Sequence, residues 1–174
     1  MKSTELKPNR RILIVDDNTS IHNDFREILC PENSADANVS EMEEVLFAEA
    51  TDAPDEPSFE LDSAYQGQEG LEMVKKALAD NRPYALAFVD VRMPPGWDGI
   101  ETIAQLWQAD PEIQIVVCTA YADYSWEEMR AKVGQPDGLL VLKKPFDNIE
   151  VLQLAHALTK KWFLSFQARS QMAA

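Results

Sequence analysis

The segment ALAFVD at residues 85–90 decides the fold, because it is a short apolar run that ends in a carboxylate, Asp90. An apolar run without alternation is typical of a strand that is buried on both faces of a parallel sheet. Three further runs have the same form, namely RILIVDD at residues 11–17, IQIVVCT at residues 113–119 and LLVLKK at residues 139–144. Each of these runs predicts a buried strand with polar side chains at its carboxyl end.

Helical patterns separate these strands. Apolar residues recur at helical spacing in residues 19–29, 67–80, 99–108 and 125–133, and again from residue 148 onward. The inward faces of the second and third helices are expected to carry Leu71, Val74 and Leu78, and Ile100, Ile103, Leu106 and Trp107. Residues 59–65 alternate in polarity and add a fifth strand. The five strand–helix repeats predict an α/β fold, a doubly wound five-stranded parallel sheet with helices on both faces.

The polar residues at the strand ends are expected to meet. In an open parallel sheet the carboxyl ends share one edge, and ligands bind there at the point where the strand order reverses. Asp16, Asp17, Asp90, Thr119 and Lys144 all follow or end a predicted strand. Three carboxylates, a hydroxyl and an ammonium in one crevice suit phosphoryl chemistry on a carboxylate, with a hard divalent metal ion as the counter-charge.

The composition indicates a small protein that works inside the cell. The chain has 174 residues, of which 45% are hydrophobic, so one domain with a full core is expected. A formal net charge of -14 makes nucleic acid and anionic membranes poor partners. The first residues lack the apolar stretch of a signal peptide, and no run is long enough to span a bilayer. We therefore expect a cytoplasmic location.

The cysteines and histidines offer little chemistry of their own. Cys30 and Cys118 lie far apart in the sequence and are expected to be buried thiols, not a disulfide or a metal pair. His22 and His156 fall within predicted helices, away from any carboxylate or serine pattern. We expect both histidines to be surface or core residues.

The segment from about residue 31 to residue 58 interrupts the repeat. No lysine or arginine occurs between Arg26 and Lys75, whereas acidic residues and prolines accumulate there. We interpret this segment as an acidic insertion between the first helix and the second strand. A surface loop is favoured over a specific docking element, although residues 42–47 can form a short amphipathic helix.

Five short motifs together resemble the receiver domain of response regulators, which act in bacterial two-component signalling. They are ILIVDD at residues 12–17, FVDVRMP at 88–94, Asp98-Gly99, Thr119-Ala120 and KPF at 144–146. The resemblance covers roughly residues 10–158. It implies a flavodoxin-like sheet with strand order 2-1-3-4-5, and a cis peptide bond between Lys144 and Pro145.

The resemblance also implies a phosphoacceptor and a metal site. Asp90 would accept a phosphoryl group from the phosphohistidine of a sensor histidine kinase or a phosphotransfer protein. Asp17, Asp90 and the backbone carbonyl of Arg92 would ligate Mg²⁺ directly, and Asp16 would act through a water molecule. Enzymatic activity would be limited to self-catalysed phosphotransfer and autodephosphorylation.

The remaining site residues would read out the phosphorylated state. Lys144 would pair first with Asp90 and then with a phosphate oxygen. The hydroxyl of Thr119 and the backbone amide of Ala120 would bind other phosphate oxygens. Thr119 would move inward on phosphorylation and shift the loop and helix that follow it.

Each of these residues also has an ordinary structural explanation. Asp17 or Asn18 can cap the first helix, and Asp98 can cap the helix that begins at Gly99. Asp90 can be a turn residue, Lys144 a solvated side chain and Thr119 a β-branched strand residue. Only their joint placement at the strand ends favours a phosphoacceptor site.

Two features depart from the usual receiver pattern, and a third residue, Arg92, has an expected role beside Asp90. Val141 occupies the position, three residues before Lys144, where receivers usually carry tyrosine or phenylalanine, and Tyr121 or Tyr124 would have to substitute for it. The chain therefore lacks the usual aromatic side chain for reading out the signal through the face of the predicted fourth helix and fifth strand. The loop at residues 94–99 looks one residue longer than usual. Arg92 lies where its side chain can screen an acyl phosphate from water, so we expect it to influence the phosphoryl lifetime.

The carboxyl-terminal pattern extends past the usual end of a receiver. An apolar stripe at helical spacing comprises Ile149, Leu152, Ala155, Leu158, Trp162 and Phe166. We expect a receiver domain at residues 1–160 and an extension of the last helix, or a linker, at residues 161–174. The stripe could pair two copies of the chain. An amino-terminal piece of a larger hybrid kinase or cyclic-di-nucleotide signalling protein, with an attached or separate output domain, is favoured over a stand-alone receiver.

Two classes of function stay open on the sequence alone. The first is a phosphoacceptor switch, and the second is a pseudo-receiver that mediates protein interactions without phosphorylation. The presence of Asp17, Asp90 and Lys144 favours the switch. A phosphatase of the haloacid dehalogenase type is a distant third, because it needs an Asp-x-Asp pair on the first strand where this chain has adjacent aspartates.

Overall fold

The structure of the chain is a computed structural model that describes residues 8–31, 59–92, 96–120, 126–133 and 139–172. Strands and helices alternate within these ranges, in the order β1 Arg11–Val15, α1 Thr19–Leu29, β2 Glu60–Ala64, α3 Gly67–Ala79, β3 Leu86–Asp90, α4 Gly99–Ala109, β4 Gln114–Thr119, α5 Trp126–Val133, β5 Leu139–Lys143 and α6 Asn148–Met172. The helix expected at residues 42–47, the rest of the insertion from residue 32, and Tyr121 and Tyr124 lie outside the described residues.

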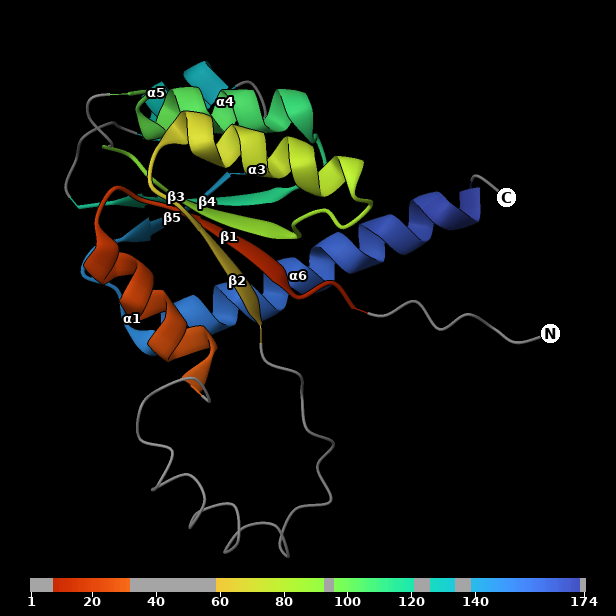
Figure 1. Cartoon of the computed structure of the whole chain (residues 1–174), viewed down its shortest axis with the longest axis horizontal. Coiled ribbons are helices and arrows are strands. Elements are labelled where there is room, and N and C mark those ends of the chain that lie inside the picture. The colour runs from red at the N-terminus through yellow and green to blue at the C-terminus, as the bar shows by residue number, and fades with distance from the viewer. Residues whose placement is uncertain (1–7, 32–58, 93–95, 121–125, 134–138, 173–174) are drawn as a thin grey trace, which may run out of the picture.

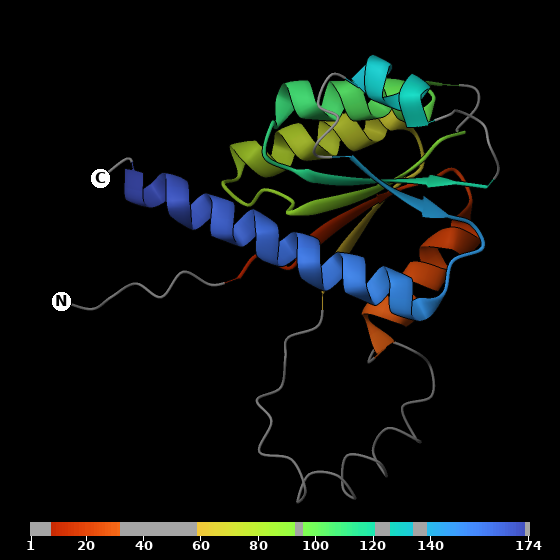
Figure 2. The same cartoon turned by 180° about the vertical axis from the view of Figure 1, so that it is seen from behind.

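The strands form one parallel sheet in the order β2-β1-β3-β4-β5. Helices α3, α4 and α5 cover one face of the sheet, and α1 and α6 cover the other (Figure 1, Figure 2). The doubly wound five-stranded α/β fold and its strand order 2-1-3-4-5 are therefore confirmed.

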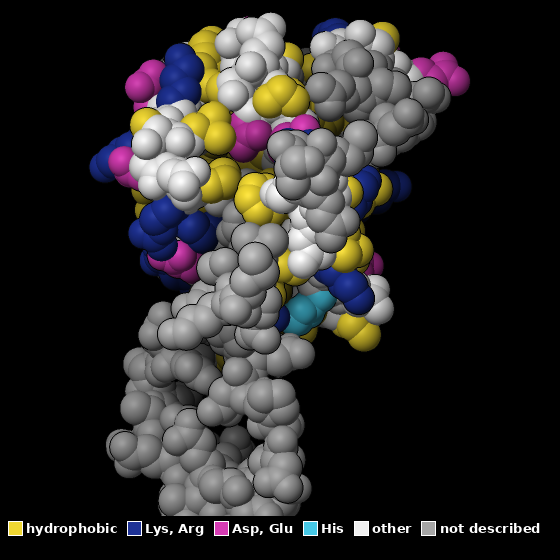
Figure 3. Space-filling view, turned by 90° about the vertical axis from the view of Figure 1, so that its right-hand side faces the viewer, with side chains coloured by type: hydrophobic (Ala, Val, Ile, Leu, Met, Phe, Trp, Pro, Cys, Tyr) yellow, Lys and Arg dark blue, Asp and Glu magenta, His cyan; other side chains and the backbone are white. Residues whose placement is uncertain are grey.

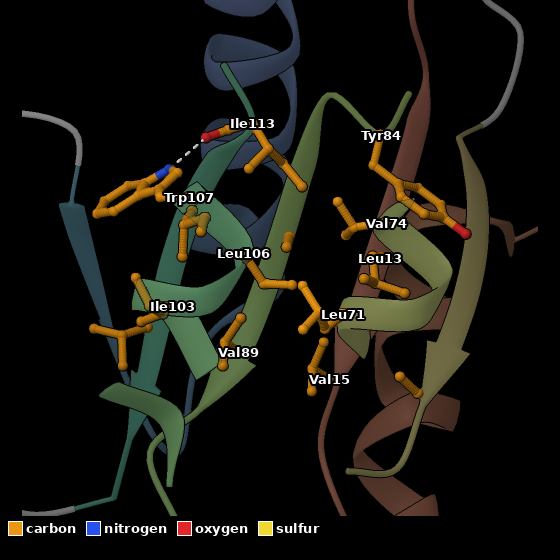
Figure 4. Packing of buried hydrophobic residues seen from close by; sticks show 14 of the residues in the cluster. Leu13, Val15, Leu71, Val74, Tyr84, Val89, Ile103, Leu106, Trp107 and Ile113 are labelled. Atoms are coloured by element: carbon orange, nitrogen blue, oxygen red, sulfur yellow. Dashed lines mark hydrogen bonds between the residues drawn. The ribbon is translucent and has the colours of Figure 1, made fainter. Parts of the chain in front are cut away.

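Two apolar clusters hold these layers together, because successive side chains of a strand point to opposite faces of the sheet. On β1, Leu13 and Val15 belong to the cluster under α3 and α4, whereas Ile12 and Ile14 belong to the cluster under α1 and α6. Figure 4 shows the first cluster, with side chains of α3 and α4 directed at those of β1 and β3. Both faces of the central strands are thus buried, which explains their unbroken apolar sequences.

Side-chain caps fix where two of the helices begin. The carboxamide oxygen of Asn18 accepts a hydrogen bond of 3.0 Å from the amide of Ser20 at the start of α1. The carboxylate of Asp98 accepts one of 2.8 Å from the amide of Glu101 in α4. Asn18 therefore caps α1, and Asp98 caps α4 as its position before Gly99 suggested.

Two apolar side chains of the predicted helical patterns point to solvent. Leu78 of α3 is 39% exposed, and Ala77 is buried instead of it. Ile149 of α6 is 64% exposed, whereas Val151 is fully buried. Most other residues of the two predicted patterns are buried, so the apolar spacing was correct and failed at one position in each helix.

Helix α6 continues without a break through residue 160 to Met172. Trp162 is buried, and its ring stacks on that of Phe166 at a centroid distance of 5.3 Å. Arg169 forms an ion pair of 3.0 Å with Glu112, which precedes β4. The predicted stripe therefore packs largely against the chain's own body, and pairing of two copies through it stays a prediction.

Other features of the described residues agree with the sequence. Cys30 and Cys118 are buried and form no disulfide. The peptide bond between Lys144 and Pro145 is cis. No helix in the described ranges combines the length and the apolar character needed to cross a bilayer.

The acidic charge is distributed unevenly along the chain. Nine acidic residues and no basic residue lie in residues 32–58, so most of the net charge of -14 belongs to that segment. Among the described side chains in Figure 3, acidic, basic and apolar groups are interspersed. The residues outside this segment therefore carry a formal net charge of only -5, from 16 basic and 21 acidic residues.

A matched pair of substitutions tests the orientation of α6. Val151→Ala should lower the free energy of unfolding by about 2 kcal/mol, because the side chain is fully buried. Ile149→Ala should change it by less than about 0.5 kcal/mol, because that side chain is exposed. Urea unfolding followed by circular dichroism measures both, and equal losses in the two variants would contradict this orientation.

Candidate functional site

The expected site residues lie along one edge of the sheet. Asp90 ends β3 and Thr119 ends β4, while Asp16 follows β1 and Lys144 follows β5. The chain runs from β1 to an outer neighbour, β2, and then crosses to the other side of β1 to form β3. Such a reversal of strand order opens a crevice at the carboxyl edge. The acidic residues lie beside this reversal.

Three carboxylates gather at this point. Asp16, Asp17 and Asp90 each offer a ligand atom, and these atoms lie within 4.8 Å of one another. Asp16 is buried and Asp90 half-buried, whereas Asp17 is exposed. Hard oxygen ligands with one side open to solvent fit Mg²⁺, which keeps several water molecules when it binds to proteins. The cluster could therefore hold a divalent metal ion.

Lys144 joins the two inner carboxylates. Its Nζ atom lies 3.1 Å from Asp16 Oδ2 and 3.1 Å from Asp90 Oδ1. The resemblance implied a pair with Asp90 alone, so the contact with Asp16 is an addition from the structure. The backbone amide of Lys144 also donates a hydrogen bond of 2.8 Å to the carbonyl oxygen of Thr119. Lys144 is thus held by its backbone as well as by its ammonium group.

The charges and the burial of the site alter its proton affinities. Burial raises the pKa of Asp90, and the negative charge of Asp16 raises it further, whereas Lys144 opposes both effects. Burial disfavours the charged form of Lys144, but the charges of Asp16 and Asp90 outweigh this and raise its pKa. Burial also raises the pKa of the nearby Cys118, which therefore stays a thiol. Lys144 therefore does not fully offset the combined effect of burial and of Asp16 on the pKa of Asp90.

The backbone around Asp90 is packed against the start of α4. Gly99 donates a hydrogen bond of 2.7 Å to the carbonyl oxygen of Val91. A Cβ atom on Gly99 would lie 2.2 Å from the carbonyl oxygen of Asp90, which is too close for any side chain. Glycine at this position therefore allows α4 to begin directly behind Asp90.

The remaining expected residues surround the cluster. Thr119 is buried at the end of β4, and Ala120 is exposed just beyond it. The side chain of Arg92 is exposed two residues after Asp90. All of the site residues expected from the sequence therefore lie at or beside the carboxyl edge.

The sequence did not reveal the part that His22 takes in this arrangement. His22 is buried, and its Nε2 atom lies 2.8 Å from the backbone oxygen of Asp16. The prediction of a surface or core residue is correct in that His22 is buried, but it did not include this contact. The only signal available was its place in α1, six residues after Asp16.

This fold, with acidic residues and a lysine at its carboxyl edge, defines a receiver domain. The sequence matches the response regulator receiver domain over residues 43–156, and the chain belongs to this family. The match begins within the insertion, so β1 and its two aspartates lie before it. The structure brings these aspartates to Asp90.

Curated relatives include two kinds of regulator. The photosynthetic apparatus regulatory protein RegA of Cereibacter sphaeroides is 35% identical over 109 residues, which are 63% of this chain and 53% of RegA. The chemotaxis protein CheY of Listeria monocytogenes is 30% identical over 95 residues, which are 55% of this chain and 75% of CheY. The chain spans about half or less of the RegA proteins that it matches.

Solved structures agree on the fold. A structure described as an adenylate cyclase from Rhodopirellula baltica aligns with a TM-score of 0.67 and 22% identity, covering 95% of this chain and 98% of that one. The signal receiver domain of an HD domain-containing protein from Pseudomonas fluorescens aligns with a TM-score of 0.66 and 17% identity, covering 96% and 98%. At such identities the likeness concerns the fold alone.

Replacement of Asp90 by asparagine tests whether its negative charge destabilises the folded chain when no metal ion is bound. Because the pKa of Asp90 is raised in the folded state, the folded chain binds this proton more tightly than the unfolded chain does. The free energy of unfolding therefore falls as the pH rises from the ordinary pKa of an aspartate to the raised pKa of Asp90 in the folded state. In EDTA at pH 7, Asp90→Asn should be more stable than the original chain, and the difference should vanish near about pH 3.

Urea unfolding at several pH values measures this difference. Mg²⁺ at about 100 times its dissociation constant should then stabilise the original chain by about 2.7 kcal/mol, and the Asp90→Asn variant by less. A loss of stability in Asp90→Asn at pH 7 in EDTA would show that Lys144 overcompensates the carboxylates.

Proposed function

We propose that the chain is a phosphoacceptor switch in which Asp90 receives a phosphoryl group from the phosphohistidine of a sensor histidine kinase or a phosphotransfer protein. The observation that carries this proposal is the ammonium of Lys144, 3.1 Å from both Asp16 and Asp90 within a three-carboxylate cluster. Membership of the receiver family supports it. In the transfer, the bond from phosphorus to the donor's imidazole nitrogen breaks and a bond to a carboxylate oxygen of Asp90 forms.

The residues around Asp90 have separate tasks in this reaction. Asp17, Asp90 and the backbone carbonyl of Arg92 would hold Mg²⁺, with Asp16 acting through water. The ion would neutralise the carboxylates and the charge of the incoming phosphoryl group. Lys144 binds the acceptor carboxylate before the transfer and a phosphate oxygen after it. Since phosphoryl transfer needs little covalent help from the protein, positioning and charge stabilisation account for most of the catalysis.

Thr119 and Ala120 would report the phosphorylated state. Thr119 is buried at the end of β4, next to the strand that carries Asp90. Its hydroxyl and the backbone amide of Ala120 would bind phosphate oxygens and favour one of two arrangements of the following loop. Val141 is half-buried on β5 and provides no aromatic side chain for this step.

Residues 1–160 would form the receiver, and the rest of α6 would lead to an output domain in the same chain or a separate protein. A second copy is one further candidate partner for this helix. Leu164 is 53% exposed and offers an apolar contact there.

Intact-protein mass after incubation with acetyl phosphate tests the phosphoacceptor. With Mg²⁺ present, the chain should gain a single phosphoryl group, and EDTA should prevent this. Asp90→Asn should gain none, whereas Asp80→Asn, the same change at an exposed position on the opposite edge, should be labelled normally. Failure of labelling by acetyl phosphate and by a phosphorylated kinase, together with no binding of beryllofluoride, would leave the pseudo-receiver as the function.

Arg92→Ala tests the screening of the acyl phosphate. Its side chain is exposed beside the acceptor, so its removal should admit water and shorten the phosphoryl lifetime by about threefold to tenfold, which is at most about 1.4 kcal/mol of barrier. The decay of the adduct mass after removal of acetyl phosphate measures this lifetime. Arg82→Ala, at an exposed position on the far edge, is the control, and an unchanged decay rate in Arg92→Ala would refute the role.

A further inference from the structure

We propose that His22 fixes the peptide between Asp16 and Asp17, and so places the carboxylate of Asp17 for binding of Mg²⁺. His22 would be a positioning residue, because it acts through the backbone and does not touch the ion or the phosphoryl group. This inference rests on the proposed function of the three carboxylates as a Mg²⁺ site.

The contact between His22 and Asp16 has a defined direction. The Nε2 atom of His22 lies 2.8 Å from the backbone oxygen of Asp16. A carbonyl oxygen can only accept a hydrogen bond, so the hydrogen must lie on Nε2. The other ring nitrogen, Nδ1, is buried and has no hydrogen-bond partner among the described residues. The N–H group of the His22 imidazole thus donates a hydrogen bond to the peptide group that links Asp16 and Asp17.

The Asp16 carbonyl is the group whose direction matters for Asp17. It belongs to the same planar peptide unit as the amide of Asp17. Fixing the orientation of the carbonyl therefore also fixes the position of the Asp17 backbone amide and Cα atom. Other contacts hold the rest of Asp16: its amide donates to Ala64 at 3.0 Å, and its carboxylate accepts from Asn18 at 2.8 Å and from Lys144 at 3.1 Å. Those contacts orient Asp16 itself, whereas the contact of His22 orients the peptide that leads to Asp17.

The imidazole is held in place from a second side. The ring of Tyr65, which follows β2, lies 4.6 Å from the ring of His22 between centroids. His22 itself is only 1% exposed, and its helix is capped four residues earlier by Asn18. The ring therefore contacts Tyr65 in addition to its hydrogen bond with the Asp16 carbonyl, and both contacts are shielded from solvent at His22.

Packing alone explains His22 poorly. A buried polar nitrogen without a partner is unfavourable, and a leucine would fill a similar space without that loss. The hydrogen bond to Asp16 offsets part of this cost, and its effect falls on the chain segment that holds two of the three carboxylates. A positioning role accounts for both the polarity and the location of the side chain.

Two substitutions separate positioning from packing. His22→Gln keeps a side-chain N–H donor of similar reach, and His22→Leu keeps the volume without a donor. In isothermal titration calorimetry of the full chain, His22→Leu should weaken Mg²⁺ binding by about fivefold to tenfold, as loss of one hydrogen bond allows. His22→Gln should restore the affinity to within about twofold. Urea unfolding in EDTA records any separate effect on stability.

The outcomes distinguish this inference from the proposed function. Equal Mg²⁺ affinities in the original chain and in His22→Leu would overturn the role of His22 and leave the Mg²⁺ site intact. Failure of the original chain to bind Mg²⁺ would overturn the metal site itself, and the inference with it. If His22→Leu does not fold, nitrogen-15 NMR of the imidazole in the original chain decides, because a hydrogen on Nδ1 and not on Nε2 would refute the contact.

Discussion

Three carboxylates share one crevice with a single ammonium, and the rest of the site depends on this imbalance. Their ligand atoms lie within 4.8 Å of one another, and Lys144 reaches only two of the three side chains. Negative charge is therefore in excess: burial raises the pKa of Asp90, and the charge of Asp16 raises it further. A divalent cation would relieve the repulsion by direct contact with oxygen atoms. The same imbalance that is expected to reduce the stability of the metal-free chain would provide affinity for the ion.

The fold maintains this unfavourable arrangement because the site residues follow strands that cannot easily move. Strands β1, β3 and β4 are apolar on both faces and buried between the two helical layers. Backbone hydrogen bonds join the residues that follow β3 and β5 to β4: Val91 donates to Cys118 at 3.1 Å, and Lys144 donates to Thr119 at 2.8 Å. Gly99 brings α4 directly against Asp90. Burial elsewhere in the sheet thus holds the carboxylates close together in spite of their mutual repulsion.

Sequence patterns predicted what depends on position along a strand, and failed where the result depends on contacts between elements. A residue after a buried parallel strand must lie at the carboxyl edge, so Asp16, Asp90 and Lys144 could be placed together from the sequence. Apolar spacing identifies a helix, but the phase of its buried face is set by the neighbouring layer. For this reason Leu78, which the spacing predicts to face the core, is exposed.

The contacts of Lys144 with Asp16 and of His22 with the Asp16 carbonyl were also beyond prediction. Both join residues that no periodicity relates, and they follow only from the packing of α1 and the end of β5 against β1. The roles of the site residues in phosphoryl transfer stay predictions. Those roles depend on the close approach of the three carboxylates and on the contacts of Lys144, which the structure shows.

The positions of the aromatic side chains indicate how a structural change at the site could be transmitted to helix α1. Val141 places no aromatic ring on β5, whereas the opposite face of the sheet carries a connected series. Phe146, two residues after Lys144, lies 5.0 Å from Phe25 of α1 between ring centroids, and Phe25 lies 4.7 Å from Phe88 of β3. Because Phe88 precedes Asp90 by two residues, this series begins and ends beside the site. A displacement of residues 144–146 would therefore disturb the packing of α1 directly, on the same helix that carries His22.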